Sequence, residues 1–448
     1  MNRRILSLAL PNIITNITVP LLGMVDMAIV GHLSASHIGA IAIGTQIFNL
    51  IYWNFGFLRM GTSGFTAQAY GAHDWNEAVR IFVRAISIAV AVAFALILLQ
   101  WPISRLSLLI FKGGSEVLQL AMAYFFVRIW AAPATLGLYA VKGWFIGMQN
   151  SRLPMWIAIF LNCVNIVCSL LFVLVLHWDI RGVALGTVIA QYSGFAVGLV
   201  FLLREMKRLK PRTTLSFRLR PLLRESLQWS SLKPFFKVNG DIFLRTVCLA
   251  TVFTFITAAS SRISPQVLAI DALLMQFFTL FSYIMDGFAY AGESLVGRYI
   301  GARDGKALRL TVKLLMRWGL GLTLLFTLIY AVGGEWILSL FSDQPEVIRG
   351  SMQYLFWTLV IPVCGFAAFL FDGIYVGATA SRTMLWCMVA ASASFFAVYY
   401  GGKLLFPAYA SSAYVWNNVL WSAFMVYLTL RGVLQALMLK KSIYNQVQ

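Results

Sequence analysis

The sequence predicts an all-α polytopic membrane protein with twelve transmembrane helices in two pseudo-symmetric six-helix bundles. Three observations carry this prediction: an apolar composition, long runs without charge, and a weak internal repeat on either side of a basic middle segment. Of the 448 residues, 60% are hydrophobic and only 11% are charged, whereas a soluble domain carries roughly 25% charged residues. The mean hydropathy is +0.80. So few polar residues cannot cover a water-exposed surface, so we expect lipid to surround most of the chain.

The apolar runs are long enough for spanning helices, which need about 20 residues each. Ala85–Ser104, Leu153–Trp178 and Val183–Leu203 contain no charged residue. A membrane β-barrel would alternate apolar and polar residues with a period of two, and these runs do not. We expect spans at 7–32, 38–70, 79–104, 117–147, 153–177, 182–204, 238–261, 265–297, 306–332, 350–378, 382–405 and 412–436.

The middle of the chain separates two groups of six spans. The segment 205–237 is basic, contains three prolines and is the only long polar connection, which is typical of a linker. We therefore expect an N-terminal six-helix bundle over 1–204, a cytoplasmic linker over 205–237, a C-terminal six-helix bundle over 238–436 and a cytoplasmic tail over 437–448.

The positive charges are distributed unevenly between the loops. Ten of the 35 Lys and Arg residues lie between Arg204 and Lys237, and nine others lie at the two ends or in Arg298–Lys313. Positively charged loops favour the cytoplasmic side, so both termini are expected to be cytoplasmic. The same distribution accounts for the net charge of +19 without a nucleic-acid partner, and the lipid bilayer is the partner that we expect.

A weak repeat relates the two halves. Phe55–Asp74 resembles Gly287–Asp304, and four further residues recur 230 positions later. These are Gly143, Gly147, Ser151 and Arg152, which match Gly373, Gly377, Ser381 and Arg382. Because six spans separate equivalent points, the halves have the same orientation, as in transporters with parallel repeats. Alternating access of two bundles is the natural use of this symmetry.

Asp26 is the ionisable residue that lies deepest in an expected span. A charge at the bilayer centre costs at least about 2.5 to 3.5 kcal/mol, so such a residue faces protein or water and is a functional candidate. No basic residue lies within two helical turns of Asp26 along the sequence. A carboxyl group in this position can accept a proton or, with further oxygen neighbours, bind Na⁺.

Other ionisable residues lie in the second half. Asp286 and Glu293 are seven positions apart and share one face of the eighth span, and Asp372 lies in the tenth span. They either line a cavity of the C-terminal bundle or pair with other helices. Asp241 and Arg245 are spaced i,i+4, which predicts a structural ion pair on the seventh span.

Nothing in the sequence indicates an enzyme. The four histidines are scattered near span ends, without the spacing of a metal site or of an activated nucleophile. A phosphate-binding glycine-rich motif is also missing from the sequence, which argues against ATP as the direct energy source. We therefore expect no catalytic residues, no metal cofactor and no organic cofactor.

Four motifs together resemble a known family. They are PLLGMVDMAIVGHL (Pro20–Leu33), FGFLRMGTSGFTAQAYGA (Phe55–Ala72), VNGDIFLRT (Val238–Thr246) and DGFAYAGESLVG (Asp286–Gly297). Over nearly its whole length the chain resembles the multidrug and toxic compound extrusion (MATE) family, and its DinF, or DNA-damage-inducible, branch in particular. The resemblance implies export of varied organic compounds, often cationic or amphipathic, across a bacterial inner membrane. It implies that inward H⁺ or Na⁺ flow drives this export, and we expect a monomer.

The resemblance also implies roles for individual residues. The first-helix aspartate of the family corresponds to Asp26, and Asn165 and Thr187 correspond to its polar partners. Relatives often have a second carboxylate four residues after the asparagine, where this chain has Ser169. A cation site with one carboxylate is weaker than one with two, which favours H⁺ over Na⁺. Asp372 falls where other branches carry a coupling aspartate, and it is the second candidate.

A flippase for lipid-linked saccharides or other amphipathic lipids is the alternative function. Such a cavity would need several cationic side chains to bind a pyrophosphate group. Four cationic residues lie near membrane depth: Arg59, Arg128, Lys142 and Arg245.

Overall fold

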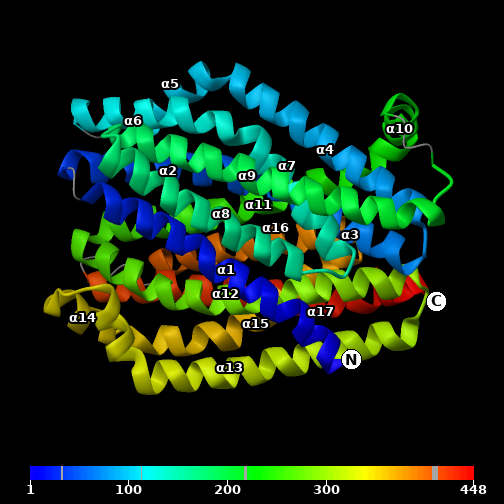
Figure 1. Ribbon diagram of the computed structural model, residues 1–448. Coiled ribbons are helices and arrows are strands. Elements are labelled where there is room, and N and C mark those ends of the chain that lie inside the picture. The colour runs from blue at the N-terminus through cyan, green and yellow to red at the C-terminus, as the bar shows by residue number, and fades with distance from the viewer. Residues whose placement is uncertain (32–33, 112–113, 216–218, 406–411, 448) are drawn as a thin grey trace. The chain divides into compact units, whose positions relative to one another are not determined.

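The computed structural model describes residues 1–31, 34–111, 114–215, 219–405 and 412–447, and within these ranges all regular structure is helical. Figure 1 shows the helices in chain order. The first half contains α1 (Asn2–Gly31), α2 (Ala35–Asn54), α3 (Phe57–Gly71), α4 (Trp75–Leu98), α5 (Gln100–Ile110), α6 (Ser115–Arg128), η1 (Ile129–Ala131), α7 (Ala132–Gly147), α8 (Arg152–Leu170), η2 (Leu171–Val175) and α9 (Asp179–Leu209). The remainder contains η3 (Lys210–Arg212), α10 (Leu219–Ser226), α11 (Trp229–Ile263), α12 (Pro265–Gly301), α13 (Gly305–Phe341), α14 (Pro345–Met352), α15 (Leu355–Gly377), α16 (Ser381–Leu405), α17 (Ala413–Ser442) and η5 (Tyr444–Val447).

The predicted fold class is confirmed. Eleven helical segments among the described residues are long and apolar enough to cross a membrane. The first expected span is α1, a helix of 30 residues whose side chains are described only in part. Four expected spans are interrupted: 38–70 divides into α2 and α3, 117–147 into α6, η1 and α7, 79–104 into α4 and α5, and 350–378 into α14 and α15. The second break precedes Pro133, which has no N–H to bond to the carbonyl four residues earlier.

Much of the basic segment 205–237 is helical. α9 continues to Leu209, α10 follows, and α11 begins at Trp229, before the expected start of the seventh span. Arginines of α4 hold α10: Arg84 Nε donates to the Ser226 carbonyl at 2.9 Å, and Arg80 pairs with Glu225 at 3.1 Å. At the other end of the chain, α17 extends to Ser442, beyond the expected end of the last span.

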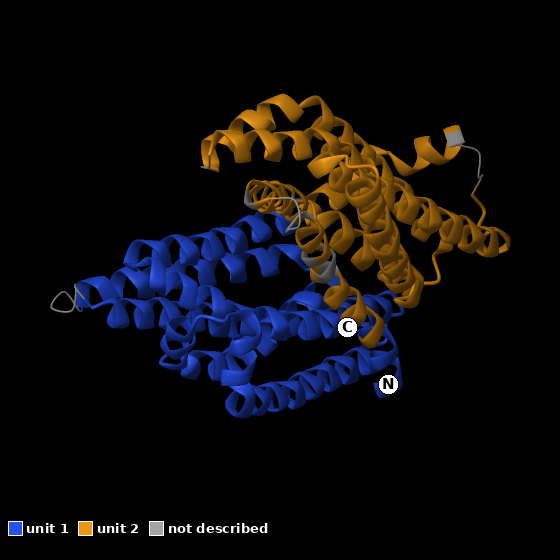
Figure 2. Cartoon of the chain, turned by 60° about the vertical axis from the view of Figure 1, so that its left-hand side comes forward, with its two compact units in different colours: residues 1–9, 240–448 blue, residues 10–239 orange. Residues whose placement is uncertain are grey.

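The helices form two compact units. One contains residues 10–239, and the other contains residues 240–448 together with residues 1–9 (Figure 2). Side chains of the first residues bond within the unit that contains residues 240–448, because Arg4 donates to the Tyr299 hydroxyl at 3.2 Å and the Trp318 indole donates to Asn2 at 3.3 Å. The start of α1 therefore packs with α12 and α13.

The repeated glycines allow close helix packing in both units. A Cβ atom on Gly373 would lie 2.0 Å from the Ala289 carbonyl oxygen, and one on Gly377 would lie 2.3 Å from the Glu293 carbonyl oxygen. Their counterparts do the same between α7 and α3, where a Cβ on Gly143 would lie 2.5 Å from the Arg59 carbonyl oxygen. Backbone atoms cannot move aside as a flexible side chain can, so these positions require glycine.

We expect the substitution Gly373→Ala to destabilise the protein by about 1 to 3 kcal/mol, because the added methyl group pushes α15 away from α12. Gly401→Ala is the matched control, since a Cβ atom there meets nothing within 4 Å. Thermal unfolding of the purified variants in detergent measures the difference. Equal unfolding temperatures for the two variants would show that α12 and α15 do not need this contact.

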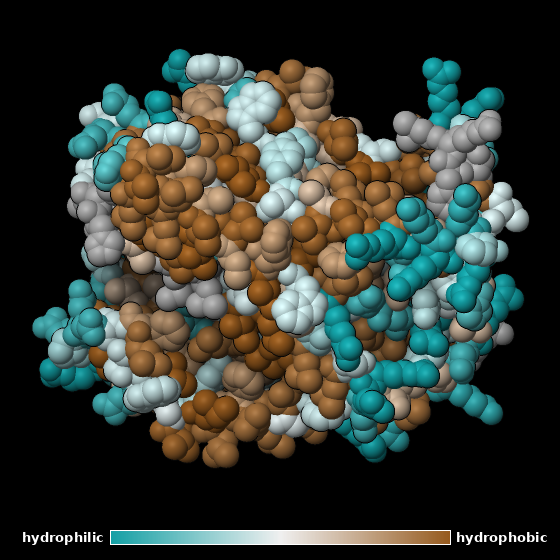
Figure 3. Space-filling model, in the orientation of Figure 1, coloured by the Kyte–Doolittle hydropathy of each residue, from teal (hydrophilic) through white to brown (hydrophobic). Residues whose placement is uncertain are grey.

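The surface is suited to lipid. Figure 3 shows hydrophobic residues over the middle of one face and hydrophilic residues gathered toward its sides. Many large apolar side chains are exposed, among them Val332 and Leu404, each with 82% of its surface accessible. Exposed apolar surface of this extent is stable in a bilayer and not in water.

Candidate functional site

Asp26 lies in α1, and only 7% of its surface is accessible. Its hydrogen-bond donor is Ser169 on α8, whose hydroxyl lies 3.3 Å from Asp26 Oδ1. Among the described residues Asp26 is in no ion pair. A buried carboxyl group with a single neutral donor is poorly stabilised as an anion, which suits it to exchange its charge for a proton.

Asn165 and Thr187 lie together beside Ser169. Asn165 Nδ2 donates to Thr187 Oγ1 at 2.9 Å, and Thr187 Oγ1 donates to the Val183 carbonyl at 3.1 Å. Gly186 brings α9 against α8, since a Cβ atom there would lie 2.8 Å from Ser169 Oγ. The structure thus joins two of the predicted site residues to each other, whereas the hydrogen-bond donor to Asp26 is Ser169. Their participation in cation coupling stays a prediction.

Arg128, at the end of α6, adds a positive charge to this region. Its charge acts on Asp26, and its guanidinium group lies over the Phe48 ring, 5.6 Å from the centroid. Arg128 Nε and Nη1 are buried and have no hydrogen-bond partner among the described residues. The proximity of Arg128 to Asp26 could not be predicted from the sequence, because 102 positions separate the two residues (128 − 26).

In the unit of residues 1–9 and 240–448, Asp372 on α15 is held by two arginines. Arg245 on α11 and Arg431 on α17 both contact its Oδ2 atom, and Gln435 Nε2 donates to its Oδ1 atom at 3.2 Å. Asp286 on α12 also acts electrostatically on both arginines. Of the two interpretations left open for Asp372, interhelical pairing describes the structure. Its carboxylate neutralises buried guanidinium groups in this conformation.

The expected pair between Asp241 and Arg245 is not the one that forms. Asp241 accepts a hydrogen bond from Ser381 Oγ at 2.7 Å, and Arg245 pairs with Asp372. Arg245 is only 4% accessible, whereas Asp241 is half-buried one helical turn earlier. A buried guanidinium group needs a buried counter-ion, and Asp372 supplies it from a neighbouring helix.

Two further acids lie on α12. Glu293, predicted to share a face with Asp286, is 1% accessible, and α15 packs closely against its backbone at Gly377. Asp271 is also buried, and the sequence prediction missed it. It lies six residues after Pro265, close to the start of the span, so its depth was not evident. Only the packing of α11 and α17 around it shows that it is enclosed.

Comparison with known proteins decides the family. The family model described as MatE matches residues 11–171 and 242–400, which together make up most of the chain. The chain belongs to the MATE family. This MATE protein is therefore a multi-pass membrane transporter for multidrug or toxin efflux and not an enzyme.

Two relatives are similar to this chain over most of its length. The transporter is 35% identical to DNA damage-inducible protein F of Escherichia coli K12, over 95% of this chain and 89% of that protein. It is 26% identical to the chloroplastic protein DETOXIFICATION 44 of Arabidopsis thaliana, over 94% of this chain and 84% of that protein. The alternative function, a flippase for lipid-linked saccharides, finds no support among these relatives.

Solved structures share the fold. A MATE protein in a bent conformation matches with a TM-score of 0.85 at 17% identity, covering 99% of this chain and 96% of that one. The Vibrio cholerae MATE transporter VcmN in a bent form matches with a TM-score of 0.84 at 18% identity, covering 99% and 97%. A MATE structure in a straight conformation matches equally well, with a TM-score of 0.84 at 17% identity, covering 99% and 96%.

Proposed function

We propose that this transporter is an antiporter that exports varied amphipathic organic compounds, often cationic, in exchange for inward protons. The observation that carries the proposal is Asp26, a buried carboxyl group in α1 with one neutral hydrogen-bond donor and no ion-pair partner among the described residues. Proton binding removes a costly buried charge, and loss of the proton restores it. Exchange follows if substrate binds the form in which Asp26 is ionised.

Two features favour H⁺ over Na⁺ as the coupling ion. Relatives often have a second carboxylate where this chain has Ser169. The Ser169 side chain offers only a neutral oxygen. Arg128 places a fixed positive charge in the same region, and this charge repels any further cation near Asp26. A proton that binds covalently to the carboxyl oxygen needs no shell of ligands, whereas Na⁺ does.

A bend in α1 is the movement that we associate with this exchange. Pro11 and Pro20 lie inside α1, and proline within a helix removes a backbone hydrogen bond and permits a kink. Related proteins have been crystallised in bent and in straight conformations. We propose that the charge on Asp26 biases α1 between two such shapes.

The oligomeric state, the membrane and the orientation that we propose follow from the charge distribution and from the family. The transporter acts as a monomer in a bacterial inner membrane, with both termini and the basic segment around α10 in the cytoplasm. The uneven distribution of Lys and Arg supports this orientation. Protease protection of a C-terminal tag in membrane vesicles of known sidedness tests it.

Reconstitution in liposomes tests the coupling ion. We expect an imposed proton gradient to drive accumulation of a fluorescent organic cation, whereas a sodium gradient of the same size without a pH difference drives none. Accumulation driven by sodium alone would contradict proton coupling. Protein-free liposomes give the background in both cases.

The double substitution Arg128→Gln with Ser169→Asp should create sodium dependence. It removes the positive charge near Asp26 and adds a second carboxylate, which together make a stronger oxygen site for a cation. We expect sodium-driven uptake to rise several-fold above the background of protein-free liposomes in the same assay, a level that the unaltered protein should not exceed. Ser104→Asp, on α5, is the control for the added acid. Unchanged ion preference in the double variant would show that these two residues do not set it.

A further inference from the structure

Asp271, on α12, is a buried acid that three neutral hydrogen-bond donors surround. Its surface is 2% accessible, and neutral groups on two neighbouring helices donate to it. Asn417 Nδ2 and Trp421 Nε1, both on α17, lie 2.9 Å and 2.8 Å from its Oδ1 atom, and the Ser260 hydroxyl on α11 lies 2.5 Å from Oδ2. We call these four residues the Asp271 site.

No charged group among the described residues stabilises Asp271. The polar groups that face it are those of Ser260 on α11, of Asn417 and Trp421 on α17, and of Tyr354 between α14 and α15. Tyr354 is the titratable one among them. This contrasts with Asp372 in the same unit, which two arginines hold.

The Asp271 site can satisfy a carboxylate and also a protonated carboxyl group. The single hydrogen of the Ser260 hydroxyl has two acceptors within reach, Asp271 and the Ile256 carbonyl at 2.9 Å. When it turns to Ile256, the Ser260 oxygen can accept a hydrogen bond from protonated Asp271. Asn417 offers a second acceptor, because its Oδ1 atom is fully buried and has no partner among the described residues. Rotation of its amide by half a turn would present this oxygen to Asp271.

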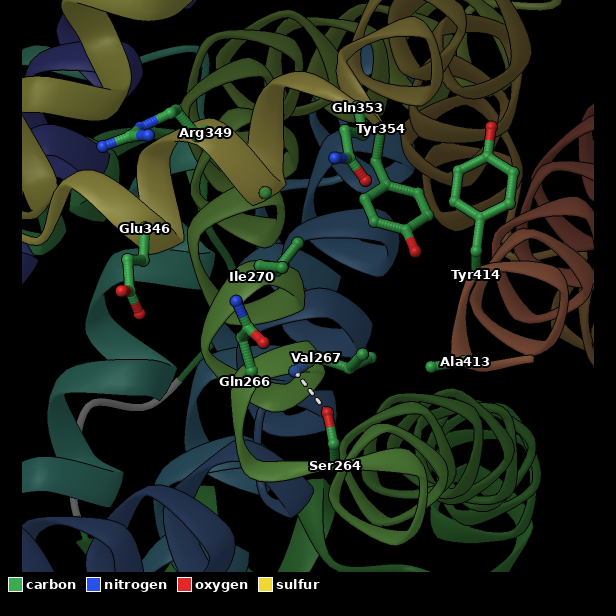
Figure 4. Close-up of a pocket in the computed structure, with 11 residues that line it drawn as sticks. Ser264, Gln266, Val267, Ile270, Glu346, Arg349, Gln353, Tyr354, Ala413 and Tyr414 are labelled. Carbon is green, nitrogen blue, oxygen red and sulfur yellow. Dashed lines mark hydrogen bonds between the residues drawn. The ribbon is translucent and has the colours of Figure 1, made fainter. Parts of the chain in front are cut away.

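A cavity lies beside this site. Its volume is about 490 Å³, far more than one water molecule requires. Figure 4 shows Glu346 and Arg349 of α14 on one side and the rings of Tyr354 and Tyr414 on the other. Tyr354 lines this cavity and also interacts with Asn417 and Asp271. Tyr354 therefore connects the residues that line the cavity with those that surround the buried carboxyl group.

The internal repeat relates this site to the one around Asp26. Asn417 lies 230 positions after Thr187 (417 − 187), the same offset that relates the repeated glycines. Thr187 accepts a hydrogen bond from Asn165, one helical turn before the Ser169 that donates to Asp26, whereas Asn417 donates to Asp271 directly. The two acids themselves are on non-equivalent helices, α1 and α12.

We propose that Asp271 is a second proton-binding site, reached through the cavity beside Tyr354. The carboxylate takes one proton from water in the cavity and becomes a carboxylic acid, and it returns that proton to water later in the transport cycle. The proposal rests on proton coupling by this transporter, and it adds one proton to the number exchanged for each substrate molecule.

The number of protons exchanged per substrate tests the proposal. In proteoliposomes with a fixed substrate gradient, the pH difference that stops net substrate movement gives this number. Asp271→Asn should need a larger pH difference than the unaltered protein, equivalent to one proton fewer. Glu346→Gln, which removes an exposed acid at the cavity, should leave the balance point unchanged. An unchanged balance point for Asp271→Asn would overturn the proposal and leave Asp271 a structural acid.

A second measurement applies even to a variant that no longer transports. Infrared difference spectra between high and low pH report the C=O stretch of carboxyl groups that bind protons. In the Asp26→Asn background, we expect a band that disappears when Asp271→Asn is added and that shifts with Ser260→Ala. Identical spectra with and without Asp271 would overturn the proposal. Failure of the proposed function gives a different result, namely no proton-driven transport by the unaltered protein.

Discussion

Asp26→Asn should abolish proton-driven export while leaving the fold intact. Asparagine has nearly the size of aspartate and keeps an oxygen that can accept the Ser169 hydrogen bond, but it cannot bind and release a proton. We expect gradient-driven uptake by proteoliposomes to fall to the level of protein-free liposomes. The thermal unfolding temperature should change little, because a buried charge is replaced by a neutral group of the same shape.

Asp343→Asn is the matched control for this experiment. Asp343 lies in the short connection between α13 and α14 and is exposed, so the same change of charge occurs outside the spans. It should transport like the unaltered protein. Normal proton-driven transport by Asp26→Asn would show that another group couples proton flow to export.

Asp372→Ala should cause the largest loss of stability. The substitution leaves Arg245 and Arg431, both almost fully buried, without the carboxylate that contacts them. Removing one partner of a buried ion pair costs about 3 to 5 kcal/mol, because the remaining charge stays uncompensated. Thermal unfolding in detergent should show a large decrease, accompanied by poor recovery of the protein from membranes.

A compensating variant separates charge from packing in this network. Replacing the three residues together, as in Asp372→Leu, Arg245→Met and Arg431→Met, removes every charge of the cluster, and such replacements are often neutral or stabilising. We expect the triple variant to be clearly more stable than Asp372→Ala. If Asp372→Ala unfolds at the same temperature as the unaltered protein, Asp286 is a sufficient counter-ion for both arginines.

Hydropathy was enough to predict the spans, because a bilayer requires long apolar helices whatever their packing. The interruptions at Phe55–Gly56 and at Ile129–Ala131 were not predicted, since neither is marked by a polar stretch. The repeat glycines could be recognised from the sequence, but their purpose could not. The structure shows that Gly143 and Gly373 each let a helix approach a backbone carbonyl group.

The sites were harder to predict, because they depend on contacts between distant segments. Asp26 could be recognised from its position deep within an expected apolar span. Its hydrogen-bond donor Ser169 could not be predicted, because it lies 143 positions away in the sequence. The i,i+4 spacing predicted that Arg245 forms an ion pair with Asp241 on its own helix. Its partner in the structure is Asp372 on α15, 127 positions away. Asp271 was overlooked near the start of its span, and only contacts from α17 reveal its burial. Sequence spacing describes neighbours within one helix, and these sites join several.

Proton release on substrate binding is the most direct measurement of the central claim. A saturating concentration of an organic cation is added to purified transporter in weakly buffered detergent solution with a pH indicator, at a pH where the Asp26 carboxyl group is protonated before substrate binds. The unaltered protein should acidify the solution, and Asp26→Asn should release up to one proton fewer per molecule. Equal proton release by the two proteins would contradict the assignment of Asp26 as the group that exchanges its proton for substrate.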